Sequence, residues 1–316
     1  CSRSPLRSAR RAIPSSAQKN NQMRKIVMGV VALMLVGAGG ITGLRLYSVA
    51  KPVEAIALTG DVGAGAYLAR ASGCIACHTD VEGGGPPLAG GTGFETPFGT
   101  VYAANLTTGP DFGIGDWAIE DFAKAVRQGL SPDDVPYYPV FTYAFYQDFS
   151  DQQIADLWAA FQTVAPVSEP VPATDLAFPF SERDSLKLWR AAFLHAPRTT
   201  SVLGQSDTWN RGCELVEDAT HCAACHTERN IAGGRKVDTG WMQGNDVLPG
   251  GSKAPAITSA ALVSSGWDVD SLSYALQTGI TPSGDTFGGS MGEVVQMGTR
   301  FMTQEDRIVM VTYLMD

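Results

Sequence analysis

Two five-residue motifs constrain this chain more than any other feature. Residues 74–78 read CIACH and residues 222–226 read CAACH, and both have the C-x-x-C-H pattern that attaches a c-type haem. Two thiols on one turn of backbone reach both vinyl groups of one haem, and the next histidine is placed to bind the iron from the proximal side. The sequence therefore predicts two covalently bound haem c groups, with thioether links at Cys74, Cys77, Cys222 and Cys225 and proximal iron ligands at His78 and His226.

Other uses of paired cysteines explain these motifs less well. A zinc ribbon keeps its two C-x-x-C pairs close in sequence, whereas these pairs lie 148 residues apart. A thioredoxin-like redox pair explains neither the histidine that follows nor the repetition. Cys213 lies in a segment of helical pattern, where a small core residue is the expected role, and Cys1 is given no role.

The N-terminal region predicts export. Residues 26–44 form a run of 19 residues without a charge, and a helix of that length just spans the hydrocarbon core of a bilayer. Residues 1–25 carry seven basic and no acidic residues, whereas the remainder carries 16 basic and 32 acidic residues. The positive-inside rule keeps the basic segment in the cytoplasm. We therefore expect a single anchor at residues 26–46 in a bacterial inner membrane, with the haem domains in the periplasm.

A cleaved signal peptide is the alternative interpretation of this segment. Ser48, Val49 and Ala50 form a tolerable cleavage site, and Met23 would open such an export signal. The apolar run is longer than the core of a usual signal peptide, so an uncleaved anchor is favoured. The acidic remainder excludes nucleic-acid binding and suits a basic docking partner.

An internal repeat divides the chain after the N-terminal segment into two similar units. Trp117 and Trp267 lie 150 residues apart, and so do Gly129 and Gly279. Each unit has a helical segment before its haem motif and long glycine- and proline-rich loops after it, which we expect to wrap a haem. The predicted fold is mainly α, with two tandem class I cytochrome c domains at residues 55–170 and 205–316, joined by a proline-rich linker and linking helix at 171–204.

Helix boundaries are predicted from periodicity and end signals. Residues 117–128 and 267–277 are amphipathic segments that end at a glycine. Ser150 and Thr303 are expected N-caps for closing helices at 151–164 and 304–315. Further helices are expected at 61–72, 181–194 and 207–219, and strand signals are sparse.

Several sequence blocks resemble the cytochrome c subunit of membrane-bound alcohol and gluconate dehydrogenases. In the first unit the blocks are TPFGTVYAANLT (96–107), GIGDW (113–117), DFAKAVRQG (121–129) and PFSERDSLKLW (179–189). In the second unit they are WNRG (209–212), HCAACHTERN (221–230) and GGSMGEVV (288–295). The blocks occur in the family's order, and the resemblance covers nearly everything from about residue 70 onward.

The resemblance implies electron transfer. Such subunits receive electrons from a periplasmic dehydrogenase and pass them to quinone or another cytochrome, so redox protein partners are expected: a dehydrogenase subunit, another cytochrome, or an oxidase or quinol complex. The dehydrogenase subunits carry three haems, whereas two haem motifs occur here. Smaller diheme cytochromes of the same lineage also exist, so the resemblance does not transfer a substrate. No acid, base and nucleophile constellation is visible, and an electron carrier is expected rather than an enzyme.

Methionine is the expected distal ligand of the second haem, because a thioether on the far side of the iron raises the haem potential. The family's motif places this ligand at Met291, which lies 65 residues after His226. Met297 and Met302 are rival candidates.

The first haem has no readable distal ligand. No methionine occurs between His78 and Trp241, and Phe141 and Phe149 stand at the two places where the family has one. The alternative is five-coordinate iron with an open face, which would make the protein a haem enzyme or a gas- or peroxide-reactive protein. Candidate ligands are His195, Tyr143, Tyr146 and Lys124, while His221 is sterically awkward as a distal ligand of its own haem.

Three further side chains are candidates for contacts with the haem edge. Arg127 could pair with a haem propionate, although a solvated helix arginine is an equally good interpretation. Trp117 and Trp267 could donate an indole N–H to a propionate or simply pack on the haem edge.

Overall fold

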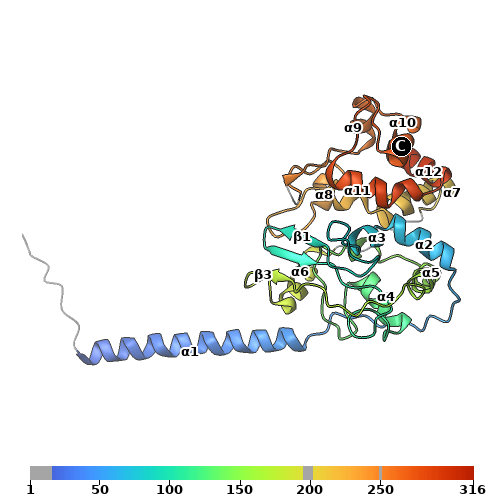
Figure 1. The fold of residues 1–316 in the computed structure, drawn as a ribbon. Coiled ribbons are helices and arrows are strands. Elements are labelled where there is room, and N and C mark those ends of the chain that lie inside the picture. The colour runs from blue at the N-terminus through green and yellow to red at the C-terminus, as the bar shows by residue number, and fades with distance from the viewer. Residues whose placement is uncertain (1–15, 195–201, 249–250) are drawn as a thin grey trace, which may run out of the picture. The chain divides into compact units, whose positions relative to one another are not determined.

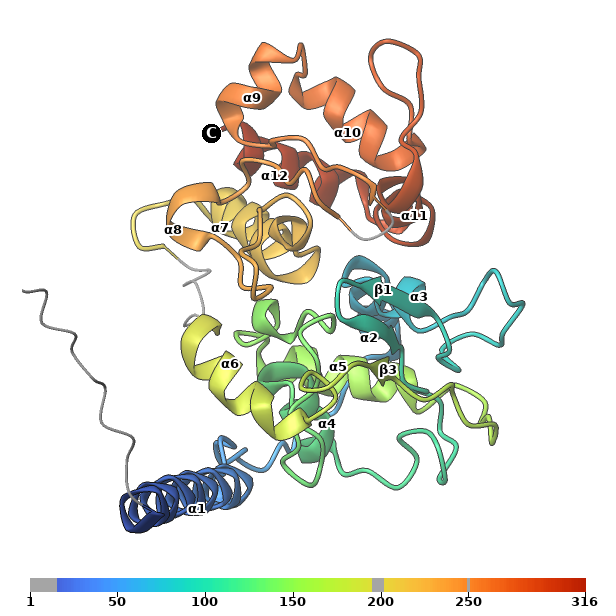
Figure 2. The same ribbon diagram turned by 90° about the vertical axis from the view of Figure 1, so that its left-hand side faces the viewer.

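Helices dominate the folded part of the chain, as the sequence predicts (Figure 1). The computed structural model describes residues 16–194, 202–248 and 251–316. Residues 1–48 and residues 49–316 form two separate units. In the larger unit, α7 to α12 gather on one side, and α2 to α6 gather with the strands on the other (Figure 1, Figure 2).

The first half of the larger unit is built on a pair of crossing helices. α2 spans Val62–Ala71, and α5 spans Asp151–Phe161 with the Ser150 side chain accepting a hydrogen bond at its N-terminus. The helices approach closely because Gly65 has no side chain: a Cβ there would lie 1.8 Å from the Asp156 carbonyl oxygen. α4, at Ile119–Gln128, packs against α5 and ends where Gly129 adopts the left-handed conformation that favours glycine.

The second half repeats this construction. α7 spans Asp207–Cys213, continues into a π-helical turn at Glu214–Ala219, and crosses α12 at Gln304–Met315. A Cβ on Gly212 would lie 2.4 Å from the Val309 carbonyl oxygen, so this crossing also depends on a glycine. α10 spans Val269–Thr278 and ends at left-handed Gly279, as α4 ends at Gly129. The remaining helices are α8 (Val237–Gly240), α9 (Ser259–Ser264) and α11 (Gly289–Met297).

Several helix boundaries differ from those expected. α10 begins at Val269 rather than at residue 267, and α6 covers only Leu186–Phe193 of the expected 181–194. α4 begins two residues after Trp117, because the Ala118 backbone is extended and the Asp121 carboxylate accepts its N–H. α5 ends at Phe161 rather than at residue 164, ahead of Pro166, whose ring disfavours helix at the residue before it.

A small antiparallel sheet is an element that the sequence analysis did not predict. β1 (Gly93–Thr96) and β2 (Gly99–Tyr102) form a hairpin, and β3 (Asp175–Leu176) pairs with β2 from the proline-rich connector. The connector then leads into a 3-10 turn at Arg183–Ser185 and the linking helix α6 at Leu186–Phe193. Arg183 donates from Nε to the Pro136 carbonyl at 2.9 Å and so holds the start of α6 on the first half.

One hydrophobic cluster draws residues from both halves. Ile154 and Leu157 of α5 share it with Leu215 and Val216 of the π-helical turn and with Met310 of α12. A smaller cluster lies within the second half, around Leu262, Leu272, Leu276 and Val311. The halves therefore share a core, and the division of residues 49–316 into domains at 55–170 and 205–316 stays a prediction.

The N-terminal unit contains α1, at Ser16–Leu46. The segment of residues 23–44 is long and apolar enough to cross a membrane. A signal sequence has the same property. Large apolar side chains such as Met28 and Val36 are exposed in the structure. An exposed apolar helix of this length suits a lipid environment rather than water.

Candidate haem-binding sites

The first haem motif forms a single helical turn. α3 spans Cys74–Cys77, and the chain enters it through Gly73, whose φ of 68° is left-handed. Burial, with a smaller contribution from Cys77, raises the pKa of the Cys74 thiol to about 12. Thiols of this kind are protonated at neutral pH and are poor zinc ligands or redox nucleophiles. Within the described residues, no group of three or more metal-ligating side chains gathers either.

The second motif has a matching local structure. A 3-10 turn spans Cys222–Ala224, and the chain enters it through His221, whose φ of 41° is also left-handed. The Thr220 hydroxyl lies 3.2 Å from the Cys222 sulfur. Burial raises the pKa of the Cys222 thiol to about 11, so this thiol is also protonated at neutral pH, whereas Cys225 is exposed.

Each motif's histidine is oriented by a backbone carbonyl. Nδ1 of His78 lies 2.7 Å from the Ala104 carbonyl oxygen, and Nδ1 of His226 lies 2.7 Å from that of Pro255. Burial lowers the pKa of both imidazoles, although the hydrogen bonds oppose this effect. A neutral ring that donates from Nδ1 leaves Nε2 free to coordinate a metal, which is the arrangement expected of a proximal haem ligand.

The loops that follow the two histidines are also built alike. The hydroxyl of Thr79 accepts a hydrogen bond from the Leu88 N–H at 3.1 Å, and the hydroxyl of Thr227 accepts one from the Met242 N–H at 3.1 Å. Leu88 and Met242 both adopt positive φ angles, of 61° and 55°. Left-handed conformations at non-glycine residues are uncommon, so their recurrence at matching places indicates one loop structure used twice.

A further backbone match extends from the ends of α4 and α10. The Tyr137 N–H donates to the Gly129 carbonyl at 2.8 Å, and the Phe287 N–H donates to the Gly279 carbonyl at 2.8 Å. Tyr137 and Phe287 lie 150 residues apart, and so do Gly129 and Gly279. The same spacing separates Trp117 from Trp267 in the sequence.

In this alignment of the two halves, Phe141 is equivalent to Met291. Each lies four residues after the hydrogen-bonded residue of its half, and the two are 150 residues apart. Met291 is half-buried on α11 beside the smaller hydrophobic cluster. Met302 is only 4% exposed and packs in the larger cluster, as a core residue does, and Met297 is half-buried. The sequence analysis did not draw this equivalence, although the spacing of the repeat could have revealed it.

An aromatic cluster surrounds Phe141. Its ring centroid lies 6.0 Å from that of Tyr137, 5.9 Å from that of Tyr143 and 6.2 Å from that of Tyr146. Tyr143, Tyr146 and Phe149 are all buried. The segment from Tyr137 to Phe149, where the sequence analysis looked for a distal ligand, is therefore closely packed with aromatic rings.

Two of the candidate ligands for the first haem are engaged elsewhere. The Tyr146 hydroxyl donates to the Ser72 carbonyl at 2.8 Å and accepts from Thr142. Lys124 donates from Nζ to the Pro132 carbonyl and to Asp134, both at 2.9 Å. Among the described residues, the buried hydroxyl of Tyr143 has no hydrogen-bond partner of suitable geometry. His195 lies outside the residues that the structure describes.

His221 lies between the two haem motifs. Its ring centroid is 5.9 Å from that of Phe145 and 5.8 Å from that of Tyr146, and a Cβ on Gly73 would lie 3.6 Å from its Nε2. Burial lowers the pKa of His221 to about 4, so the ring is neutral. Gly73 and His221 hold equivalent positions before the two motifs, and the motifs therefore adjoin through matching residues.

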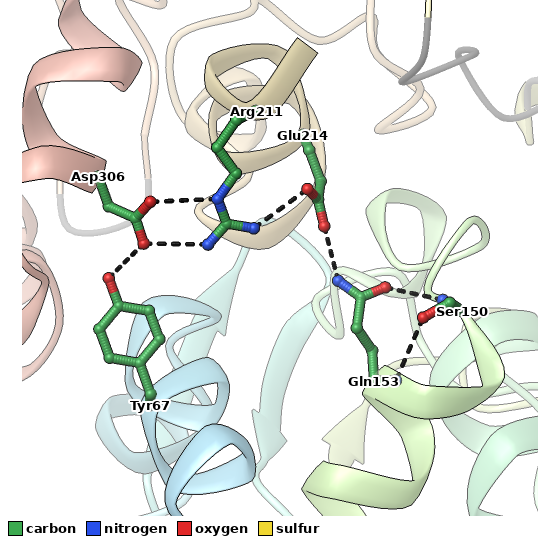
Figure 3. Close-up of polar contacts among 6 residues, drawn as sticks. All are labelled: Tyr67, Ser150, Gln153, Arg211, Glu214 and Asp306. Atoms are coloured by element: carbon green, nitrogen blue, oxygen red, sulfur yellow. Dashed lines mark hydrogen bonds and ion pairs between the residues drawn. The ribbon is translucent and has the colours of Figure 1, made fainter. Parts of the chain in front are cut away.

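A polar network locks the two halves together (Figure 3). Asp306, near the start of α12, accepts the Tyr67 hydroxyl of α2 at 2.5 Å and pairs with Arg211 of α7 at 3.0 Å. Gln153, near the start of α5, donates to Glu214 of the second half at 2.7 Å. Asp306 and Gln153 are each the third residue of the closing helix of their half. Each half therefore uses the same helix position to bind a residue of the other half.

The remaining candidates for haem contact have partners in the protein. Arg127 donates to the Phe149 carbonyl at 2.7 Å and to Asp151 at 2.8 Å, and so ties α4 to the start of α5. Trp117 packs against the larger hydrophobic cluster and Trp267 against the smaller one. Their contacts with a propionate stay predictions.

Comparison with known proteins places these features in a family. No family model matches the chain. A protein described as "Diheme cytochrome c-type" from Cereibacter sphaeroides is 34% identical over 295 residues, which cover 92% of this chain and 97% of that protein. The chain belongs to the diheme c-type cytochromes. It carries two covalently bound haem c groups, and relatives of it are named as cytochromes or cytochrome subunits.

Other relatives of this diheme cytochrome are named as subunits of dehydrogenases. The fructose dehydrogenase cytochrome subunit of Gluconobacter japonicus is 36% identical over 84% of the chain. The cytochrome c subunit of a quinone-dependent alcohol dehydrogenase from Gluconacetobacter polyoxogenes is 35% identical over 79% of the chain. The chain spans 54% of the length of each. The resemblance drawn from the sequence blocks is thus confirmed.

Proposed function

We propose that this cytochrome carries electrons on the periplasmic side of the membrane, between a dehydrogenase or quinol-linked donor and the respiratory chain. Its residues form two class I cytochrome c domains, in which Cys74, Cys77, Cys222 and Cys225 hold the haems and His78 and His226 bind iron. The observation that carries the proposal is the proximity of the two motifs, since a Cβ on Gly73 would lie 3.6 Å from Nε2 of His221, and adjoining cofactors exchange electrons rapidly.

The residues on the distal sides give the proposal a direction. The Met291 sulfur can bind iron and raise its potential, whereas the phenyl ring of Phe141 offers no donor atom. Once bound, the haem of the first half is therefore the lower-potential group, and electrons run from it to the haem of the second half. Tyr143, Tyr146 and Phe149 enclose the first half's distal segment and keep water away from it.

The N-terminal helix supports a membrane location for this carrier. We assign α1 as an uncleaved anchor, because its apolar run exceeds the usual core of a signal peptide. The names of the relatives support a dehydrogenase as the donor. The net negative charge of the whole chain, −9, suits a basic docking surface on that partner.

Affinity purification from native membranes tests the partner. The full chain is tagged at its C-terminus, extracted in mild detergent, and the co-purifying proteins are identified by mass spectrometry. We expect a subunit that binds a flavin or quinone cofactor, and the complex should weaken as salt is raised. Recovery of the cytochrome alone at low salt, from membranes that oxidise the donor's substrate, would contradict the proposal.

The aromatic residue at position 141 supports a second candidate function. With no thioether opposite His78, the first haem could bind a small ligand such as carbon monoxide or peroxide. Addition of carbon monoxide to the reduced protein distinguishes this function from pure electron transfer. A spectral change in one of the two haems favours it, whereas unchanged spectra show that a protein side chain fills the sixth position.

A further inference from the structure

One buried and one half-buried arginine lie near Tyr143 and Phe145, where the linking helix meets the second half. Arg190 of α6 is 8% exposed, and its guanidinium carbon lies 5.2 Å from the Tyr143 ring centroid. The guanidinium carbon of Arg235, from the loop after the second motif, lies 4.0 Å from the Phe145 ring centroid. Both arginines lower the pKa of Tyr143, although burial raises it by more. Both guanidinium groups therefore lie close enough to Tyr143 to act on its hydroxyl.

The charge of this arginine cluster is not balanced by a carboxylate. Within the described ranges, neither Arg190 nor Arg235 has an acidic residue at ion-pair distance, and Nη1 of Arg190 has no hydrogen-bond partner. Burial, with Arg229 adding to the effect, lowers the pKa of Arg235 to about 10. A buried positive charge without an opposite charge nearby is unfavourable, so the buried guanidinium of Arg190, with the half-buried guanidinium of Arg235 also near Tyr143, calls for an anion to compensate it.

We propose that Arg190, Arg235 and the hydroxyl of Tyr143 form a clamp for a propionate of the haem held at Cys74 and Cys77. The inference rests on the assignment of that haem in the proposed function. A haem brings two carboxylates, and guanidinium groups bind a carboxylate through paired, charge-assisted hydrogen bonds.

The position of the clamp selects the first haem. Tyr143 lies two residues after Phe141, whose ring it contacts, and Tyr146 of the same segment bonds to Ser72 beside the first motif. Arg229, in contrast, already donates to the Gly233 carbonyl at 2.9 Å and lies on the side of Cys225. The site therefore belongs to the first haem, although one of its two arginines comes from the second half.

The clamp has a consequence for the haem potential. Positive charge near a haem favours the reduced state, because reduction adds an electron to the group. Arg190 and Arg235 would therefore raise the potential of the first haem and offset part of the loss caused by the missing thioether. The second half would then tune the cofactor of the first.

Spectroelectrochemical titration of the full chain tests this inference. The variants are Arg190→Gln, Arg235→Gln and Tyr143→Phe, and the control is Arg300→Gln, an exposed arginine whose guanidinium carbon lies 5.7 Å from the Phe301 ring centroid. We expect each arginine variant to change the ratio of oxidised to reduced first haem about tenfold toward oxidised at a fixed potential, with a smaller effect for Tyr143→Phe and none for the control.

Conservative variants separate charge from structure. Arg190→Lys and Arg235→Lys keep the charge and should recover most of the potential, whereas a merely structural role would not distinguish Lys from Gln. Haem staining after denaturing electrophoresis confirms that both haems remain attached. If the first haem's potential is unchanged in both Gln variants, or only the second haem shifts, the clamp is wrong while the electron-transfer proposal stands.

Discussion

The two halves of the larger unit share a scaffold but differ on their distal sides. Both orient a histidine through a carbonyl 2.7 Å from Nδ1, and both end an amphipathic helix at a left-handed glycine. At matching positions of the repeat, however, the first half has Phe141 and the second has Met291, for which we propose the distal role. If that role holds, the backbone of the repeat is kept while a single side chain sets the chemistry of each cofactor.

The surroundings of Phe141 and Met291 also differ, in how far they are enclosed. The first half closes its segment with buried rings and the linking helix, whereas Met291 lies half-buried on α11 near a small cluster. The first half is therefore the more enclosed of the two.

Loss of one cysteine pair should have the largest effect. Replacing Cys222 and Cys225 together by alanine removes both thioether links of the second half, so covalently bound haem should fall to half of its wild-type amount. A pyridine haemochrome assay on denatured protein measures this ratio. Cys213→Ala is the control, because Cys213 is a buried cysteine at the end of α7 and belongs to neither motif, and it should keep both haems. Equal loss from the control and the double variant would refute the assignment.

Exchange of the distal residues should have the next largest effect. Met291→Phe copies the first half into the second and should lower the second haem's potential by on the order of 0.1 V, since axial ligands set haem potentials over about 0.8 V. Phe141→Met should raise the potential of the first haem if the thioether reaches the iron.

The control for this exchange is Met302→Leu, which alters a buried core methionine. It should leave both potentials in place. If Met302→Leu lowers the potential of the second haem and Met291→Phe does not, the distal ligand is Met302 rather than Met291.

Truncation in the shared core should destabilise both halves together. Leu157 is 1% exposed in the cluster that draws on both halves, and Leu157→Ala should cost about 2–5 kcal/mol of unfolding free energy. Val263→Ala, at a side chain 60% exposed, should cost within about 0.5 kcal/mol. Denaturant unfolding followed by haem absorbance and by fluorescence is the measurement. If the second half keeps its wild-type midpoint in Leu157→Ala, the halves fold independently.

The polar network between the halves should give the smallest effect, and one that depends on pH. Burial opposes the ionisation of Asp306, but hydrogen bonds from Arg211 and Tyr67 outweigh it and lower the pKa. A lowered folded-state pKa adds stability above the ordinary carboxyl pKa, which is lost as pH falls through the folded-state value.

Asp306→Asn should therefore cost about 1 kcal/mol at neutral pH, with the deficit shrinking in acid. Thermal unfolding from neutral pH to about pH 3 measures this change. Glu305→Gln, at the exposed neighbouring position, is the control and should leave the pH profile unchanged. A deficit that persists in acid would assign the effect to packing rather than charge.

Local signals in the sequence were sufficient to predict much of this architecture. The glycines at 129 and 279 and the caps at Ser150 and Thr303 all act where the sequence analysis expected them. These signals are local because a cap or a left-handed glycine satisfies backbone groups of its own helix end.

Features that join distant segments were missed. The two-residue strand Asp175–Leu176 exists only because it pairs with β2, more than 70 residues earlier. The approach of Arg190 to Tyr143 and of Arg235 to Phe145 depends on how the linking helix meets a loop of the second half, which sequence periodicity does not indicate. The match of Phe141 with Met291 was hidden for another reason, since it needed the repeat to be followed residue by residue beyond the tryptophans.

Stepwise reduction of the intact full chain, recorded optically at equilibrium, tests the central claim most directly. The account predicts two one-electron waves, with the far-red methionine–iron band of the oxidised protein lost entirely in the wave at higher potential. A single wave for both haems, or a methionine band that disappears with the lower-potential wave, would contradict it.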